Sequence, residues 1–439
     1  MSLPPWRRNQ IAVTVAAVLV FAGFTLVLPF LPYYVEAVGV RGRAVNVWSG
    51  VLLSVAPLLA ALMAPVWGRL ADRYGMKIMV QRTTLTMVIH WILMAFAQNV
   101  THLLALRIFL GLFSGFATMS VALVTLGAPP EKTGSLVGTL QASQILAASA
   151  GPFFGGLLYE TIGLRATCFV TALFCLAGFA LISFSYDDRD VSPSPAPRSG
   201  PGSPRATGIL ARPFSPSRTR GSMDPDRIPL RSIAALPGFA AIAAVLFFAT
   251  VISRSFGLVT PIVVQQFMTG AGGVGLLAGI AVSSGSLAEA LSAMVQGRMS
   301  GRMSPQVLIF MGLLLASVAV LPMILARGVL AFTALRTLQG LVAGGTLTLG
   351  YTMAGRIIPE SARATGYGLL SSAAMMGGAF GPVLAGLISY GFGMQWVFAA
   401  ASVGYAGLAM VALAGVRRDI GRAGEPPASA PRPYIPVPR

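Results

Sequence analysis

The sequence predicts an all-α membrane protein in which twelve transmembrane helices form two pseudo-symmetric six-helix bundles. Three observations support this fold class. Only 10% of the 439 residues are charged and 55% are hydrophobic, whereas a soluble domain carries about 25% charged residues. Apolar stretches long enough to cross a bilayer recur along the chain, and its two halves share motifs at a constant spacing. A soluble enzyme is therefore disfavoured.

The transmembrane segments are predicted from length, because a helix needs roughly 20 apolar residues to cross the hydrocarbon core. Twelve such runs occur, at residues 11–38, 47–67, 78–98, 103–126, 135–159, 164–185, 237–266, 272–296, 306–326, 329–354, 364–390 and 393–415. The first run is too long for a cleaved signal peptide. Within it, Pro29-Phe30-Leu31-Pro32 predicts a kinked helix that lines a cavity.

The break between the sixth and seventh runs is rich in Pro, Ser, Gly and Arg. Such a segment cannot bury enough apolar surface to fold. We therefore expect four parts: a six-helix bundle at 1–185, a disordered cytoplasmic linker at 186–236, a second bundle at 237–415 and a cytoplasmic tail at 416–439.

The orientation follows from the basic residues in the short loops, which favour the cytoplasmic side. One predicted side holds 16 basic residues even without the linker, whereas the other holds only Arg41, Arg43, Arg165 and Arg327. We therefore expect both termini on the cytoplasmic side of the inner membrane. The net charge of +18 reflects this topology, and nucleic acid is not an expected partner because apolar runs separate the basic residues.

The two bundles carry equivalent motifs. Gly68 and Arg73 match Gly297 and Arg302 at a spacing of 229 residues, and Arg107 matches Arg336 at the same spacing. Equivalent halves of this kind pack about an axis along the membrane normal, with the substrate site between them. The repeat therefore favours a transporter over a receptor or a membrane enzyme.

The loop after the second run carries a long motif, Gly68-Arg69-Leu70-Ala71-Asp72-Arg73-Tyr74-Gly75-Met76-Lys77. It resembles the G-x-L-a-D-R-x-G-r-K signature of the major facilitator superfamily, and this likeness covers all twelve runs; within the superfamily the chain resembles the twelve-helix drug:proton antiporter branch. The resemblance implies that Asp72 caps the N-terminus of the eleventh helix, where a negative charge is favourable, and releases it during the conformational switch. It implies gating roles for Gly68, Asp72, Arg73, Gly75 and Lys77, and in the second copy for Arg298 and Arg302. There, Gly301 stands where the aspartate would be, so a latch in that copy must be weaker.

The fifth run carries Gly138 and then Gly151-Pro152-Phe153-Phe154-Gly155-Gly156. This segment is similar to the motif of the superfamily's antiporters, with Ala147 in place of one glycine. The likeness implies export. Close packing of Gly151 and Gly155 with a bend at Pro152 would explain the same residues equally well.

Glu289 is the one carboxylate well inside a predicted span, about 17 residues into the eighth run. Ionisable groups at membrane depth are costly and mark functional sites. We expect Glu289 to carry the coupled proton and to attract cationic substrates; alternatively, it points into cytoplasmic water. Arg254 and Arg336 are predicted toward the outer side, too far from Glu289 for a direct ion pair.

Arg107 lies roughly 8 Å below the outer surface, about five residues into the fourth run. In the superfamily, the arginine of this L-x-x-R-x-x-x-G pattern is implicated in proton coupling. Glu36 is predicted at a similar depth in the first run, so we predict a Glu36–Arg107 pair that a proton can open. The alternative is that Glu36 is a rim residue in water.

A drug-sized ligand favours a large apolar cavity with a few polar groups. The residues expected to line it are Gln141, Gln144, Phe21, Phe24, Tyr33, Met119, Arg254 and Arg336. For the aromatic residues and methionine, contact with lipid or with the protein core is the alternative interpretation.

No cofactor or metal is expected. Gly270-Ala271-Gly272-Gly273-Val274-Gly275 fits a dinucleotide pattern but lacks the preceding strand that such a site needs, so it predicts a flexible hairpin. Cys168 and Cys175 are predicted to be packed free thiols, and His90 and His102 lie too far apart for a metal cluster.

These observations predict a monomeric secondary transporter that exports small lipophilic compounds, with cations among the candidates, in exchange for protons. Its partners would be the small-molecule substrate, protons and the lipid bilayer. An uptake symporter, or an exporter of one metabolite such as a sugar or siderophore, is the alternative. A third hypothesis is a non-transporting sensor that recruits a partner through its linker, which deletion of residues 190–230 would test.

Overall fold

The computed structural model describes residues 4–126, 128–129, 132–186, 236–268, 272–359 and 362–423, and all regular structure in these residues is helical. The predicted linker lies outside the described residues except at Tyr186 and Leu236. Residues 424–439 of the predicted tail also lie outside them.

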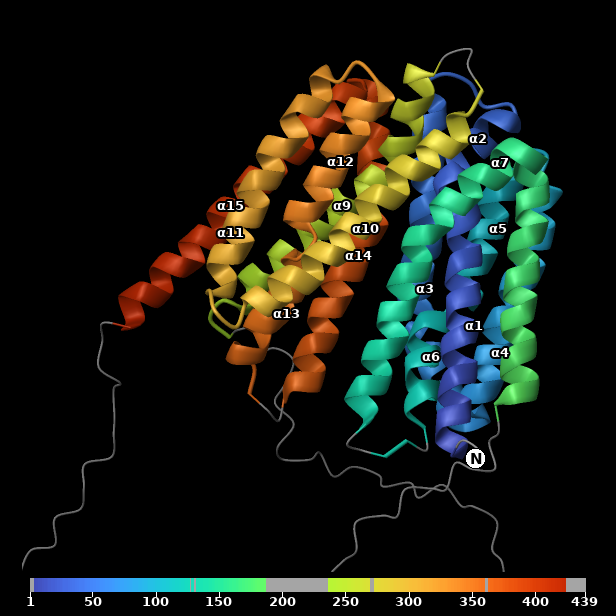
Figure 1. The fold of residues 1–439 in the computed structure, drawn as a ribbon, viewed down its shortest axis with the longest axis horizontal. Coiled ribbons are helices and arrows are strands. Elements are labelled where there is room, and N and C mark those ends of the chain that lie inside the picture. Colours follow the sequence, from blue (N-terminus) through green and yellow to red (C-terminus); the bar gives the residue numbers. More distant parts are fainter. Residues whose placement is uncertain are drawn as a thin grey trace, which may run out of the picture.

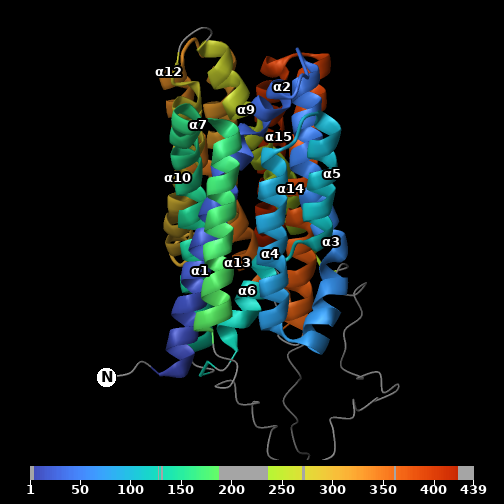
Figure 2. The ribbon, with the colours of Figure 1, turned by 90° about the vertical axis from the view of Figure 1, so that its right-hand side faces the viewer.

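The first half of the structure, residues 4–186, is the blue-to-green bundle in Figure 1. Its elements are α1 (Pro5–Val27), the 3-10 helix η1 (Leu28–Phe30), α2 (Leu31–Ala37), α3 (Ala44–Tyr74), α4 (Met76–Ala95), α5 (Val100–Phe113), α6 (Phe116–Thr125) and α7 (Thr133–Ser185). Figure 2 shows α1 and α7 side by side, and their packing is the most extensive in this half.

The second half, residues 236–423, is the yellow-to-red bundle in Figure 1. Its elements are α9 (Phe239–Phe267), α10 (Val274–Met299), α11 (Pro305–Val320), the 3-10 helix η3 (Leu321–Leu325), α12 (Val329–Ala343), α13 (Thr346–Ile357), α14 (Arg363–Gly391) and α15 (Met394–Ala423). The last helix therefore continues eight residues past the predicted end of the bundle at residue 415.

Within the described residues, ten helical segments are long and apolar enough to cross a membrane. One of them, α7, has 53 residues and covers the fifth and sixth predicted spans, whereas one crossing needs only roughly 20. Gly163, with φ at +79°, interrupts the helical geometry inside α7. The tenth predicted span corresponds to α12 and α13, each of which is too short alone. The all-helical, multi-pass class is confirmed, and twelve crossings remain a prediction.

The predicted kink in the first span is confirmed. The chain leaves α-helical geometry at Leu28–Phe30 and resumes it at Leu31. Proline causes this break because its ring removes a backbone donor and clashes with the preceding turn. Pro29, Phe30 and Pro32 are buried. The kink therefore packs against protein in this structure, whereas the sequence predicted that it lines a cavity.

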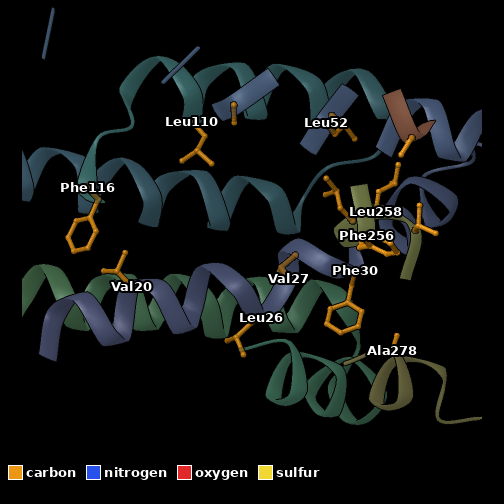
Figure 3. Close-up of a cluster of buried hydrophobic side chains, with 14 of the residues drawn as sticks. Val20, Leu26, Val27, Phe30, Leu52, Leu110, Phe116, Phe256, Leu258 and Ala278 are labelled. Atoms are coloured by element: carbon orange, nitrogen blue, oxygen red, sulfur yellow. The ribbon is translucent and has the colours of Figure 1, made fainter. Parts of the chain in front are cut away.

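The two halves meet at one end, the predicted outer end, which carries the α2–α3 and α9–α10 connections. In Figure 1 the halves converge at the top near α2, and the lower ends of α13 and α14 stand apart from those of α3 and α6. A single apolar core runs across the junction. In Figure 3, Phe30 of the first half lies near Leu258 and Ala278 of the second half.

Two glycine contacts build the junction symmetrically. A Cβ at Gly279 of α10 would overlap the carbonyl oxygen of Pro152 in α7, and a Cβ at Gly50 of α3 would lie 2.5 Å from that of Pro382 in α14. Gly50 and Gly279 are 229 residues apart in the sequence, which is the spacing of the repeated motifs. The predicted duplication thus corresponds to two equivalent helix–helix seams.

Candidate functional site

The candidate site is an ion pair inside the second half. The Nη2 atom of Arg336 in α12 lies 2.9 Å from Oε1 of Glu289 in α10. The Ser253 hydroxyl of α9 donates to the same oxygen at 3.4 Å, and Oε2 of Glu289 has no hydrogen-bond partner among the described residues. The Glu289 side chain is 29% exposed and the Arg336 side chain 6%. One carboxylate oxygen therefore remains available to a proton or to a cationic ligand.

This pair corrects the prediction that Glu289 lies too far from Arg336 for an ion pair. The prediction converted sequence position to depth at 1.5 Å per residue, as if both helices stood upright. Figure 1 shows α10 running obliquely past α12. A tilted helix changes depth more slowly along its sequence, and two long side chains span the remaining distance.

Glycines allow the two helices to approach closely. A Cβ at Gly340 of α12 would lie 2.5 Å from the carbonyl oxygen of Gly285 in α10, and one at Gly344 would overlap the backbone of Glu289. A Cβ at Gly285 would lie 2.8 Å from Cζ of Arg336. The guanidinium thus occupies space that any larger residue at position 285 would fill.

Three further buried groups surround Arg336. Its Nη1 donates to Oε1 of Gln339 at 2.5 Å, and Nε2 of Gln339 donates to the Tyr405 hydroxyl of α15 at 2.9 Å. The Arg336 guanidinium also lies 5.0 Å from the centroid of the Phe256 ring. Sequence reasoning did not identify Gln339, Tyr405 or Ser253, because nothing in their spacing distinguishes them from packing residues.

Glu36 and Arg107 do not form the predicted pair. Oε2 of Glu36 accepts a hydrogen bond of 2.7 Å from Nε2 of Gln265 in α9. Arg107 is buried, and its Nε and Nη2 have no hydrogen-bond partner in the part of the chain that the structure describes. In this conformation Glu36 therefore joins the two halves of the molecule and does not neutralise Arg107.

Other hydrogen bonds between the halves also lie at the predicted outer end. The hydroxyl of Tyr33 donates to the carbonyl of Pro261 at 2.7 Å. The carboxylate of Glu160 in α7 accepts from the backbone amides of Gly273, at 3.3 Å, and Gly275, at 2.5 Å. Glu160 thus caps the N-terminus of α10, where negative charge is favourable. Gly273 and Gly275 of the glycine-rich segment predicted as a flexible hairpin are anchored there, and residues 269–271 lie outside the described residues.

The predicted gating residues lie at the opposite ends of α3 and α10. Gly75, with φ at +92°, connects α3 to α4, which explains the glycine in the motif. Lys77 donates to the Tyr186 carbonyl at 2.7 Å, and Arg73 lies over the Tyr74 ring. Gly68, Arg298 and Arg302 are exposed. The Asp72 side chain lies outside the described part, so its predicted cap of the eleventh helix stays a prediction.

The antiporter-like glycines lie at helix contacts, with one exception. Gly151 and Gly155 leave no room for a Cβ against Thr25 and Leu26 of α1, and Gly156 leaves none against Gly275 of α10. Gly138 has nothing within 4 Å of the Cβ position. The motif therefore serves close packing within the first half and across the junction, with Pro152 at the Gly279 contact.

The predicted cavity residues fall into separate groups. Phe21, Met119 and Gln144 lie on the neighbouring helices α1, α6 and α7, where Nε2 of Gln144 donates to Ser120 at 3.1 Å. Phe24 contacts the Trp91 ring with 6.0 Å between centroids. Tyr33 belongs to the outer junction, and Gln141 and Arg254 are exposed. Arg336 belongs to the Glu289 pair.

A cavity that sequence reasoning missed lies between α7 and α10. It has a volume of about 350 Å³ and is lined by Leu146, Ser149, Ala150, Phe153, Ile280, Ser283, Ser284 and Leu287. Two of the lining residues are bonded to each other, because the Phe153 amide donates to the Ser283 hydroxyl at 2.9 Å. Most of the lining is apolar, so the cavity is suited to lipophilic molecules.

The described residues contain no group of three or more metal-ligating side chains. Cys168 and Cys175 are free and buried, as the sequence predicts.

Comparison with known proteins identifies related chains. A family model described as Major Facilitator Superfamily matches residues 13–327 and 242–437. The Multidrug resistance protein MdtG of Proteus mirabilis (strain HI4320) is 29% identical over 406 residues, covering 91% of this chain and 94% of the relative. The protein of that name from Escherichia coli O6:K15:H31 (strain 536 / UPEC) is 30% identical over 407 residues, covering 90% of each chain. The crystal structure of a bacterial homolog of the human lysosomal transporter Spinster, in an inward-facing and unoccupied conformation, shares the fold with a TM-score of 0.74 at 15% identity, covering 98% of this chain and 100% of that one.

Proposed function

Since this chain belongs to the major facilitator superfamily, we propose that it is a secondary transporter that exports small lipophilic compounds, cations included, in exchange for protons. The resemblance to multidrug resistance proteins over nine-tenths of the chain supports drug efflux. We place the protein in the inner membrane as a monomer with twelve crossings and with both termini in the cytoplasm.

The observation that carries the proposal is the partly exposed Glu289 carboxylate, held through one oxygen by Arg336 and Ser253. A carboxylate in this position can exist in two forms. When it is ionised, it is paired with Arg336 and attracts a cationic compound; when it is protonated, it does neither. Mutually exclusive binding of a proton and a substrate at one group is what exchange requires.

The junction between the halves supports alternating access. Glu36, Tyr33 and Glu160 all bond to the second half at the predicted outer end, and the predicted cytoplasmic ends of the helices stand apart in Figure 1. We interpret this as the inward-facing state. Export then requires the outer hydrogen bonds to break and the cytoplasmic ends to close.

The cavity between α7 and α10 supports lipophilic substrates. Several of its lining residues are exposed hydrophobic side chains on helices that span the membrane, among them Leu146, Leu287 and Phe153. A compound dissolved in the bilayer can reach this seam without passing through water. Because α10 forms one side of the cavity, a compound bound there lies against the helix that carries Glu289.

The test is the Glu289→Gln variant, which keeps the size of the side chain and removes its charge. We expect it to lose uncoupler-sensitive export of toxic cations from cells while the protein remains in the membrane at wild-type amounts. Glu36→Gln is the matched control, because the new amide oxygen can still accept from Gln265 at the junction, and it should retain export. Undiminished export by Glu289→Gln would remove that residue from the mechanism, and no uncoupler-sensitive flux in the wild type would refute the exporter itself.

A further inference from the structure

Arg107 in the first half is a buried cation without a counter-ion in the described residues. Its side chain is 1% exposed, and Nε and Nη2 have no hydrogen-bond partner. Arginine keeps its proton in proteins, so the charge persists. The three carboxylates whose side chains the structure describes are engaged elsewhere: Glu36 with Gln265, Glu160 with the start of α10, and Glu289 with Arg336.

The ring nitrogens next to Arg107 also lack well-formed hydrogen bonds in the described residues. His90 of α4 is fully buried and interacts with Arg107 and with the Leu106 backbone, but neither ring nitrogen has a partner at full hydrogen-bond geometry in the described residues. The Trp91 indole nitrogen, in a ring 4.9 Å from that of His90, is unpartnered as well. Arginine and tryptophan side chains only donate, and histidine can donate. The cluster therefore offers several N–H donors to a missing acceptor.

The equivalent arginine of the second half shows what is missing. A Cβ at Gly111 would meet Ala56 and Leu59, and one at Gly340 would meet Gly285 and Ala288. These contacts place Ala56 and Ala60 at the positions that Gly285 and Glu289 occupy in the second half. Ala60 therefore occupies the position of Glu289, so the first half has no carboxylate there. Ala56 occupies the position of Gly285, and its methyl group fills the space that the Arg336 guanidinium uses in the second half. Arg107 lies instead beside His90 and the Cys168 thiol.

We propose that the first half binds a small inorganic anion, of the size and charge of chloride, between Arg107 and His90. Unsatisfied buried polar groups in native proteins point to bound water or an ion, and the uncompensated positive charge selects an anion, because an unpaired buried charge is strongly unfavourable. Arg107, His90, Trp91 and Cys168 are at most 1% exposed, which excludes a drug-sized ligand. The anion neutralises the buried arginine of the first half, as the Glu289 carboxylate neutralises Arg336 in the second half.

The experiment measures thermal unfolding of the detergent-purified protein in sodium chloride and in sodium gluconate of equal ionic strength. A ligand that binds only the folded state raises its stability by mass action, so we expect the unfolding midpoint to be about 2–4 °C higher in chloride. Arg107→Met should abolish this difference, whereas Arg254→Met, at an exposed arginine of α9, should preserve it. Equal wild-type midpoints in the two salts would overturn the proposal.

A second variant supplies the missing counter-ion. Ala56→Gly combined with Ala60→Glu installs the residues of the second half, and we expect this protein to unfold at the same temperature in both salts. If the variants fail to fold, crystals of the wild type grown in sodium bromide decide the question. An anomalous peak beside Arg107 and His90 supports the site, and its absence refutes it. None of these measurements involves export, so the proposed function and the anion site can fail independently.

Discussion

At the scale of single residues, the pairing of Arg336 with Glu289 determines how much stability a substitution of either residue costs. Removing one partner of a buried ion pair costs about 3–5 kcal/mol, because the other charge is left without compensation. Exposure to water reduces this cost. Since Glu289 is partly exposed and Arg336 is not, the two single substitutions should differ in their effect on stability.

We expect Arg336→Gln to lower the free energy of unfolding by about 2 kcal/mol, below the fully buried value because water reaches Glu289. A lower midpoint of thermal unfolding in detergent reports this loss of stability. The double variant Arg336→Gln/Glu289→Gln should cost less than the sum of the two single changes, because neither charge is then left alone. If the stability losses of the two single variants simply add up in the double variant, the contact between Arg336 and Glu289 contributes no interaction energy.

Sequence reasoning identified the charged residues of the site and missed their geometry. Glu289, Arg336 and Arg107 were predicted because charges inside apolar runs are rare and costly. Their partners depend on helix tilt and on side-chain direction, which a depth count along the sequence does not contain. Glu36 was therefore paired with Arg107 when it bonds to Gln265, and Glu289 was left alone when it bonds to Arg336.

At the scale of helices, glycines determine how closely α7 and α10 can approach. Gly279 receives the Pro152 carbonyl, and Gly156 lies against Gly275. In lipid, helices associate through such close packing, because the apolar surroundings provide no hydrophobic driving force between them. The seam therefore depends on the absence of side chains.

Gly279→Ala should weaken this seam by about 1–3 kcal/mol, because the new methyl group overlaps the Pro152 carbonyl and forces the helices apart. Gly138→Ala is the matched control. It has open space at the Cβ position, and alanine favours the helix by up to ~1 kcal/mol. Thermal unfolding and export of the two variants are compared. Equal behaviour of both would contradict the assignment of Gly279 to the seam.

Helix predictions succeeded where hydropathy and proline dominate. The runs at 237–266 and 364–390 closely match α9 and α14, and the proline pair in the first span produces the expected break. The predicted spans at 135–159 and 164–185 correspond to the two parts of α7 on either side of Gly163, where non-helical backbone angles redirect the chain. The division of the tenth span into α12 and α13 was missed. The first helix ends at Gly344, and both Gly344 and Gly345 pack directly against α10.

At the scale of the whole molecule, the two halves hold each other through their own contacts at the predicted outer end. Those contacts join residues of the described helices and need nothing from the predicted linker. We therefore expect the predicted linker to act as a tether whose sequence matters little for transport. A recruiting sensor requires the opposite.

Replacing residues 190–230 by a Gly/Ser segment of equal length should leave most uncoupler-sensitive export intact. The equal length preserves the reach between the halves, so the exchange tests sequence alone. Protection of cells against toxic cations is measured beside the wild type, with Glu289→Gln as the inactive reference. A replacement as inactive as that reference would favour the sensor hypothesis over the exporter.

The hydrogen bond between Glu36 and Gln265 departs from the internal symmetry of the molecule. The two residues are 229 positions apart, the spacing of the repeated motifs, so each is the other's counterpart across the molecule. In a dimer of two identical six-helix chains, one residue at this position would face its own copy. Two glutamates would repel, and two glutamines would carry no charge. Within one chain the two positions can differ, so that an acid meets an amide where a symmetric dimer would place one residue against its own copy.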